Sequence, residues 1–301
     1  CSGLTGKLVI PEGVTSIGNN AFCNCRGITS ITLPSSLTSI EYQTFSGCSG
    51  LTSITLPSSL TSIGSNAFSS CSGLTSITLP SRLTEIEGLA FYNCRALTEV
   101  NYNAVSVADL SNTSNVFHGA GQDGIGIKVN FGEGVKTIPS YLFYANDETY
   151  APNIEVVNFS STITSIGDWA FNGCSGLTGA LDLSNCTSLT TIGSNAFAGC
   201  SGLTGALDLS NCTRLTSIGD SAFYGCSGLT SVTINQYVFE NAISPSVSSC
   251  GALFGNISSG ETVLVPANLI DDLGLTNFYL DLAFTRSETA NEDGYYVYTK
   301  N

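Results

Sequence analysis

Apolar and polar residues along most of this chain follow one unit that recurs many times, and the unit is longer than any helical or strand period. In residues 48–70, CSGLTSITLPSSLTSIGSNAFSS, apolar side chains stand at Leu51, Ile54, Leu56, Leu60, Ile63 and Phe68. Copies of the unit begin at residues 1, 25, 48, 71, 94, 120, 146, 174, 200 and 226. A fixed period of this length is typical of a solenoid, in which consecutive units stack on one another.

The pattern within one unit predicts its local structure. Residues 51–56 read L-x-x-I-x-L, which predicts a strand with its apolar side chains inward and with Thr52, Ser53 and Thr55 outward. Pro57 ends this strand because proline has no N–H to donate to a ladder. A second short extended segment follows at 60–63. Residues 65–68 then suit a single helical turn that places Phe68 in the core. One unit buries too little to be stable alone, so stacking is required.

The regularity of the units changes along the chain. We expect a solenoid over residues 1–256, regular at 1–93, irregular at 94–173, regular again at 174–234 and loop-containing at 235–256. In the 26-residue copies of 174–225, we expect the extra residues to lengthen the turns around 184–186 and 210–212. Residues 257–301 are expected to form a C-terminal cap, with a strand at 262–266, a short helix at 267–273, and a β-hairpin that pairs 280–285 with 295–299.

Cysteine also follows the repeat. Most of the twelve cysteines recur at the repeat spacing, in a main column at Cys25, Cys48, Cys71, Cys94, Cys174, Cys200 and Cys226 and in a second column at Cys186 and Cys212. Parallel side chains on adjacent rungs have the wrong Cβ geometry for a disulfide, so we expect free, buried thiols that pack as small apolar residues. With one His in the chain, no closed Cys/His ligand set exists, and we expect no metal site.

The motif L-x-x-I-x-L-P followed by L-T-S-I-G-x-x-A-F-x-x-C resembles the BspA-like, or treponemal-type, leucine-rich repeats. Copies are clear at 1–93 and 146–234, and the ending VLVPANLIDDL at 263–273 is similar to the usual close of that family. The resemblance implies an α/β, strand-rich fold: a right-handed leucine-rich-repeat superhelix of about ten repeats of 23–28 residues with a concave parallel β-sheet. It also implies an extracellular or bacterial cell-surface location and a role in binding host matrix proteins or other cells.

Composition and motifs narrow the functional classes. The formal charge is −14 with nine Lys and Arg, so the chain lacks the basic patch that nucleic-acid binding requires. No run of eighteen apolar residues predicts a membrane-spanning helix, and we expect no direct membrane insertion. His118 is the only His, and no nucleophile motif or phosphate-binding loop accompanies it. We therefore expect neither catalysis nor a cofactor.

Large aromatic residues gather in the irregular middle repeats. Tyr92, His118 and Tyr144 each follow the core Phe of their unit, so they are predicted to stack in three consecutive rungs. Tyr141 and Trp169 each stand two residues before the core Phe and are predicted to lie beside that stack. Exposed Tyr and Trp are preferred anchors of interfaces, which makes these five residues the leading candidates for a binding site, whereas packing against a widened turn is the competing interpretation.

A second candidate surface is an outward column of the expected concave sheet. Its members are Thr55, Thr78, Asn101, Asn130, Asn158, Asp182 and Asp208. Small polar side chains in a regular column suit a glycan or an extended protein, although Thr is also simply favoured in strands. Asp182 and Asp208 occupy the same position in neighbouring repeats, where stacking would bring two carboxylates about 5 Å apart. That arrangement fits a retaining glycosidase pair or half of a calcium site, or else a surface residue duplicated with its repeat.

Taken together, these features predict a non-enzymatic cell-surface or secreted binding protein, adhesin-like, with an extracellular protein or a glycan as its partner. Two other functions stay open. One is a carbohydrate-binding or carbohydrate-active protein that uses the concave face, and the other is a structural spacer within a larger surface protein.

Overall fold

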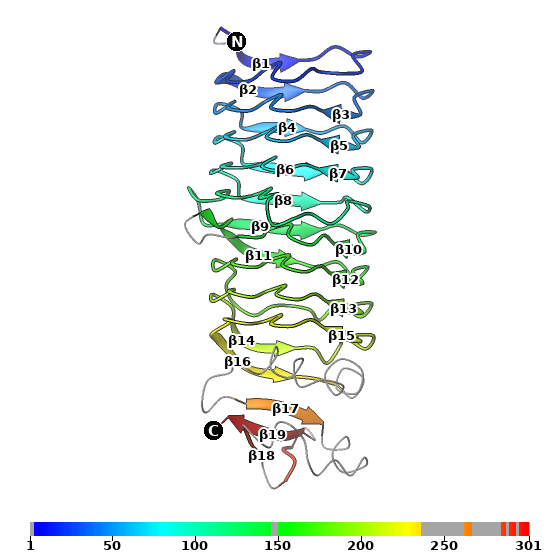
Figure 1. The fold of residues 1–301 in the computed structure, drawn as a ribbon, viewed down its shortest axis with the longest axis vertical. Helices are drawn as coiled ribbons and strands as arrows, with labels where there is room; N and C mark the ends of the chain where they lie inside the picture. Colours follow the sequence, from blue (N-terminus) through cyan, green and yellow to red (C-terminus); the bar gives the residue numbers. More distant parts are fainter. Residues whose placement is uncertain are drawn as a thin grey trace.

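The computed structural model describes residues 3–145, 150–235, 262–266, 284–286, 289–292 and 295–300. Figure 1 shows a rod of stacked rungs, with longer strands along one side and short strands along the other. The predicted parallel-strand solenoid is confirmed. Its expected helical component is wrong, because no α-helix occurs in the described residues.

The longer strands form parallel sheets in which each strand pairs with its counterpart from the next rung. One sheet holds β1 (Thr5–Val9), β2 (Gly27–Thr32) and β4 (Ser53–Thr55). The next holds β6 (Ser76–Leu79), β8 (Glu99–Tyr102), β9 (Ile127–Phe131) and β11 (Ile154–Asn158). The last begins with β14 (Thr204–Asp208) and β16 (Gly228–Thr233). Between β11 and β14, the rung at 174–199 contributes only an isolated bridge from Gly179 to Leu203.

The short strands form a second pair of parallel sheets. One consists of β3 (Ser39–Ile40), β5 (Ser62–Ile63) and β7 (Glu85–Ile86). The other consists of β10 (Thr137–Ile138), β12 (Ser165–Ile166), β13 (Thr191–Ile192) and β15 (Ser217–Ile218). Between β7 and β10, the rung that follows β8 should supply another short strand from residues 103–116. These residues form no strand. The ladder of short strands is therefore interrupted at this one rung of the described solenoid.

The segment around each core Phe is an irregular turn with left-handed backbone residues, and the predicted helical turn is wrong. The residue two before the Phe has a positive φ in each described rung: Asn20, Gln43, Asn66, Leu89, Asn115, Tyr141, Trp169, Asn195 and Ser221. The residue two after the Phe is also left-handed in most rungs, where it is Asn, Gly or Ser. This geometry lets backbone N–H groups reach the next rung, as when Phe45 donates to Ala67 at 2.9 Å and Phe171 donates to Ala196 at 2.8 Å.

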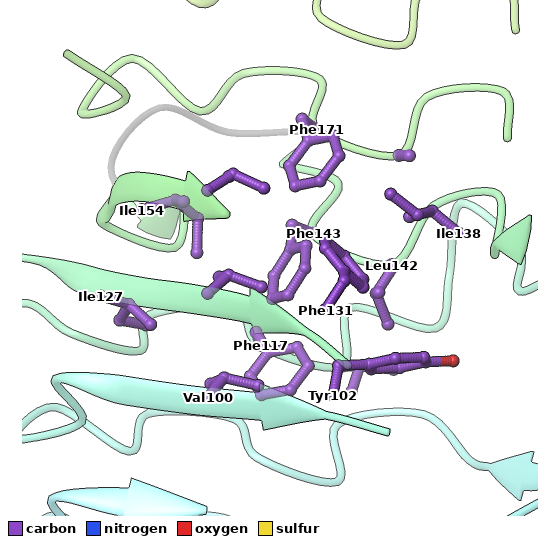
Figure 2. Packing of buried hydrophobic residues seen from close by; sticks show 14 of the residues in the cluster. Val100, Tyr102, Phe117, Ile127, Phe131, Ile138, Leu142, Phe143, Ile154 and Phe171 are labelled. Carbon is purple, nitrogen blue, oxygen red and sulfur yellow. The ribbon is translucent and has the colours of Figure 1, made fainter. Parts of the chain in front are cut away.

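The core is built from columns of identical side chains. Nine Phe rings stack along the axis with neighbouring centroids 4.9–5.6 Å apart: Phe22, Phe45, Phe68, Phe91, Phe117, Phe143, Phe171, Phe197 and Phe223. All but Phe22 are buried. Figure 2 shows part of this column beside the aliphatic side chains of the longer strands. Each ring covers the face of the next, so a rung completes its core only in the presence of its neighbours.

The cysteine columns are confirmed for the residues that the structure describes. All ten described cysteines are free, and nine of them are buried, with half-buried Cys23 as the exception. In the main column, the thiol donates a hydrogen bond to the carbonyl of the Phe in the preceding rung, for example Cys71 Sγ to Phe45 O at 3.1 Å. The same contact recurs at Cys48, Cys94, Cys174, Cys200 and Cys226. Cys1 and Cys250 lie outside the described residues.

Tyr102 fills a defect in the core at the interrupted rung. Residues 103–114 place Ser106 and Asp109 where the previous rung has Leu83 and Ile86 of the short-strand segment, and Tyr102 replaces a core Leu at the end of β8. Its side chain is fully buried, and its ring lies 5.4 Å from that of Phe131. Figure 2 shows the ring reaching toward the side on which Ile138 of β10 lies. The Tyr102 hydroxyl has no hydrogen-bond partner in the structure.

The extra residues of the 26-residue repeats are divided between a strand and a turn. Gly205 has φ 78°, and the pairing of β14 with β16 shifts by one residue between Gly205 and Ala206. Leu207 lies four positions after Leu203, whereas Val232 lies three positions after Leu229, so one extra residue lies in the strand segment, where glycine tolerates the left-handed conformation. The expectation that the turns at 184–186 and 210–212 take all the extra length is therefore wrong in part, although Cys186 and Cys212 in these turns are buried as predicted.

Three further strands follow near the C-terminus. β17 (Thr262–Pro266) pairs parallel to β16, while β19 (Tyr295–Lys300) is antiparallel to both β17 and β18 (Phe284–Arg286). β18 and β19 thus lie in the segments expected to form a hairpin. The expected loop at 235–256, apart from Asn235, and the expected helix at 267–273 fall outside the described residues. The division into a solenoid at 1–256 and a cap at 257–301 stays a prediction.

Candidate functional site

The five aromatic candidates divide into two clusters. His118 lies between Tyr92, with ring centroids 5.9 Å apart, and Tyr150, at 5.4 Å. Tyr144 is absent from this stack, so the prediction that it continues Tyr92 and His118 is wrong. The reason lies in the backbone: Gly119 donates its N–H to the carbonyl of Tyr150 at 2.6 Å, at the position where the regular repeat would place Tyr144.

The second cluster consists of Tyr141, Tyr144 and Trp169, and we call it the aromatic cluster. Tyr141 and Trp169 are parallel within 4°, with centroids 6.1 Å apart, as predicted from their shared position in neighbouring rungs. Tyr144 stands nearly perpendicular to both, at 5.2 Å from Tyr141 and 5.7 Å from Trp169. All three side chains are half-buried. They therefore support one another while each keeps part of its surface in contact with solvent.

Two members of the aromatic cluster occupy unfavourable backbone positions. Tyr141 has φ 61° and Trp169 has φ 60°. Four other rungs carry Asn at this position, namely Asn20, Asn66, Asn115 and Asn195. Asn tolerates the left-handed region better than bulky residues do, which pay about 1–2 kcal/mol there. Strained residues of this kind cluster at functional sites, so the aromatic cluster is the strongest candidate site on this solenoid.

Two exposed carboxylates border the aromatic cluster. Asp168 directly precedes Trp169, and its Oδ1 accepts a hydrogen bond from the backbone N–H of Ser194 at 2.7 Å. Asp109 reaches the rung of Tyr141, where its Oδ1 accepts from the N–H of Ser140 at 2.8 Å. Both carboxylates are thereby held in place between rungs. No Lys or Arg occurs between residues 137 and 213, so the charged residues of this stretch of the chain are all acidic.

The polar column on the long-strand face is a ladder of amides that bind each other. Asn130 donates to Asn101 Oδ1 at 2.9 Å, and Asn158 donates to Asn130 Oδ1 at 2.6 Å. Asn130 also donates to Glu99 at 3.1 Å. Thr78 pairs with Asn101 in the strand register, and Thr55 and Thr78 are both exposed. The column therefore exists as predicted, but much of its hydrogen-bonding capacity joins one rung to the next.

Asp182 and Asp208 support turns at the ends of their strand segments. Asp182 Oδ1 accepts from the hydroxyl of Ser184 at 2.6 Å and from its N–H at 2.9 Å, and Asp208 Oδ1 accepts from the N–H of Ser210 at 2.8 Å. The side-chain and then the backbone hydrogen bond of Ser184 lower the pKa of Asp182. A glycosidase needs one carboxyl that stays protonated as a general acid, and a carboxylate held in its ionised form is unsuited to that role.

The other chemistry-bearing groups of the described residues offer little reactivity. Burial raises the pKa of the core thiols, to about 11 for Cys48 and about 12 for Cys94, so these side chains stay protonated at neutral pH. Within the ranges that the structure describes, no group of three or more His, Cys, Asp or Glu side chains is arranged to hold a metal ion. Those ranges also contain no helix long and apolar enough to cross a membrane.

Three residues of this region were missed by the sequence reasoning. Tyr150 completes the stack on His118 because the inserted residues before it change which side chain returns to that position. Asp109 and Asp168 were missed because their carboxylates bind backbone N–H groups of the following rung, which no motif marks. A signal for the strained positions did exist, since Asn recurs two residues before the core Phe and predicts a left-handed turn residue.

Comparisons with known proteins give the family. No curated protein matches the chain. Among solved structures, it is similar to a leucine-rich repeat protein from Bacteroides ovatus, with 24% identity over 80% of this chain and 81% of the other and a TM-score of 0.43. It is also similar to a leucine rich cell surface protein from Faecalibacterium prausnitzii, with 25% identity over 84% and 72% and a TM-score of 0.38.

A third similar structure is the T. pallidum leucine rich repeat protein, with 21% identity over 74% of this chain and 77% of the other and a TM-score of 0.35. The family model for the BspA type leucine rich repeat region matches six copies, which cover residues 1–120 and 136–251. These matches span most of the solenoid described above, and the chain belongs to the BspA-type leucine-rich repeat family.

Proposed function

We propose that this chain is a non-enzymatic binding protein of the cell surface or the extracellular space, adhesin-like in function, which binds an extracellular protein through the aromatic cluster. The observation that carries the proposal is the strained placement of Tyr141 and Trp169, at positions where other rungs form the same turn with Asn. Half-exposed Tyr and Trp rings that are already packed against one another provide rigid contact area at a low entropic cost on binding. Membership of the BspA-type family supports the extracellular location.

The long-strand face is the weaker candidate for a binding surface. Its Asn ladder is internally hydrogen-bonded, and its two Asp carboxylates support turns, so a glycan would have to displace contacts that already exist. Carbohydrate cleavage gains no support here either, since each Asp carboxylate already accepts a hydrogen bond from a turn residue. A pure spacer role leaves the strained aromatic residues without an explanation.

The test removes the rings without disturbing the turn. Trp169→Asn and Tyr141→Asn introduce the residue that the repeat itself uses at this left-handed position, and Gln43→Asn, at φ 53° on a distant rung, is the matched control. The wild type and the three variants are applied to an array of purified extracellular matrix proteins and to a glycan array, after circular dichroism has shown that each is folded.

We expect matrix-protein binding that falls about thirtyfold or more in the Trp169 and Tyr141 variants and is unchanged in the control, as for removal of an interface anchor. Equal binding by all four proteins would refute the proposed site. A partner found only on the glycan array, and retained by both ring variants, would move the functional surface to the long-strand face.

A further inference from the structure

The interrupted ladder of short strands leaves a groove in the surface beside the aromatic cluster. The groove has a volume of about 300 Å³ and lies between β7 and residues 107–111. Its apolar part consists of Ile86, Val107 and Leu110, and its charged part consists of Glu85, Glu87 and Asp109. It opens where a regular rung would place the next short strand, so the missing strand of residues 103–116 is its physical cause.

The apolar part of the groove is held by the core beneath it. Val107 and Leu110 are half-buried and pack against the hydrophobic core. The contact between the two walls is weak, since Ala108 N–H lies 3.4 Å from the carbonyl of Thr84. At about 300 Å³, the groove has room for a side chain of a partner.

Every charged side chain that lines the groove is acidic. Glu87 accepts a hydrogen bond from the N–H of Ser65 at 2.8 Å, and Asp109 accepts one from the N–H of Ser140 at 2.8 Å. In each carboxylate, one oxygen makes this contact and the other is left for a ligand. Glu85 is exposed on β7. Because the two anchored carboxylates are fixed by the backbone of other rungs, a cation would meet oriented acceptors and little reorganisation would be needed.

The groove and the aromatic cluster adjoin each other through Asp109. This residue lines the groove, and it binds the N–H of Ser140, the residue that directly precedes Tyr141. On the next rung, Asp168 stands directly before Trp169. Along the surface, the groove with its carboxylates and apolar side chains comes first, and the parallel aromatic rings with a carboxylate beside them follow. Both halves of this surface suit a cationic side chain with an aliphatic stem, by ion pairing in the groove and by cation–π contact at the rings.

We infer that the groove and the aromatic cluster together bind a basic, extended segment of a protein partner, with Arg or Lys side chains seated in the groove. This inference rests on the proposed function and names the chemistry of its partner. Charge complementarity favours this occupant: three carboxylates and no Lys or Arg line the groove, and the net charge is −14. A neutral glycan would gain little from three carboxylates, and an acidic glycan would be repelled by them.

The experiment uses a fluorescein-labelled peptide of alternating Arg and Ser and the same peptide with neutral citrulline in place of Arg. Fluorescence anisotropy measures the binding of both to the full chain. The groove variant is Glu85→Gln with Glu87→Gln and Asp109→Asn, in which amide oxygens still accept from Ser65 and Ser140. The control variant is Glu12→Gln with Glu41→Gln and Asp220→Asn, which changes the net charge equally on distant rungs and also alters hydrogen-bonded acids.

We expect the wild type to bind the Arg peptide and not the citrulline peptide. The affinity for the Arg peptide should be about tenfold lower in the groove variant and in Trp169→Asn, and within about twofold of wild type in the control variant. Equal losses in the groove and control variants would mean attraction to net charge alone and would overturn the inference. So would equal binding of the citrulline peptide. If the Arg peptide does not bind, and Trp169→Asn nevertheless loses binding to a matrix protein, the inference falls and the proposed function stands. If neither ring variant loses any partner, the proposed function fails.

Discussion

The buried cysteine columns predict a steep loss of stability at alkaline pH. The pKa is raised by burial to about 11 for Cys48 and Cys212 and to about 12 for Cys94, Cys186 and Cys226. Burial also raises the pKa of Cys71, Cys174 and Cys200 well above the ordinary value of 9.0. The folded state therefore keeps these thiols protonated at a pH at which the unfolded chain releases their protons.

The sign and size of the effect follow from proton linkage. A raised pKa in the folded state contributes stability that is fully present below the unfolded pKa and is lost as the pH rises through the folded pKa. At pH 10, each thiol that titrates at about 9 when unfolded and at a clearly higher pH when folded removes on the order of 1 kcal/mol. Eight such thiols together remove on the order of 10 kcal/mol, which is comparable to the whole stability of an ordinary domain. We expect the free energy of unfolding to fall steeply as the pH rises above about 9.

Urea unfolding followed by circular dichroism, from neutral pH to pH 10.5 with a reductant present, measures this loss. Cys71→Ala should lower the free energy of unfolding at neutral pH by about 1–2 kcal/mol through its cavity, and should then lose about 1 kcal/mol less than wild type by pH 10. Val129→Ala, which creates a cavity without removing a titrating group, should keep the full alkaline loss. A wild-type free energy of unfolding that is the same at pH 7 and pH 10 would refute the reasoning.

Three further changes test single features of the structure. Tyr102→Phe should stabilise the protein by about 1–3 kcal/mol in urea unfolding, because the buried hydroxyl has no partner, and a destabilised variant would mean that a partner exists. The free energy of unfolding of Trp169→Asn should be about 1 kcal/mol higher than that of Trp169→Ala, because both variants lose the ring but Asn tolerates φ 60° better than Ala does. Equal free energies would mean that the turn is unstrained. The free energy of unfolding of Asp182→Asn should stay within about 0.5 kcal/mol of wild type, because the amide oxygen can still accept from Ser184, whereas Asp182→Ala should lose about 1 kcal/mol. Polysaccharide hydrolysis that Asp208→Asn abolishes would contradict a purely structural role for these residues.

Much of the fold was predictable from sequence because each core column repeats the same residue type. Leu, Ile, Phe and Cys return at equal spacing, and this periodicity alone placed the long strands, the short strands and the free thiols. The helical turn was wrong because four residues before a Phe are too few to distinguish a turn of helix from an irregular turn. The recurrent Asn at 66 and the Gly or Asn after the Phe mark left-handed residues, which are incompatible with a continuous helix.

The candidate site was predictable only where the repeat stays in register. Tyr141 and Trp169 share one position in neighbouring rungs, so their stacking followed from the alignment. Tyr144 was misplaced because an insertion brings Tyr150 to the carbonyl position opposite Gly119, and insertions change neighbours in ways that spacing does not encode. The groove could not be predicted either, because it arises from the absence of a strand at residues 103–116 and not from any motif.

The solenoid itself does not require rings at the positions of Tyr141 and Trp169. Rungs with Asn66 or Asn195 at the same place form the same left-handed turn, the same inter-rung hydrogen bonds and the same Phe stack. What the rings add lies at the surface: they pack on each other and on Tyr144, and each keeps part of its side chain exposed beside a fixed carboxylate. The groove of the missing strand adjoins the same rungs through Asp109. Two departures from the repeat that share one place on the rod are better explained by a common partner than by two unrelated losses of regularity, and the matched Asn variants separate these explanations because they restore the repeat at one position at a time.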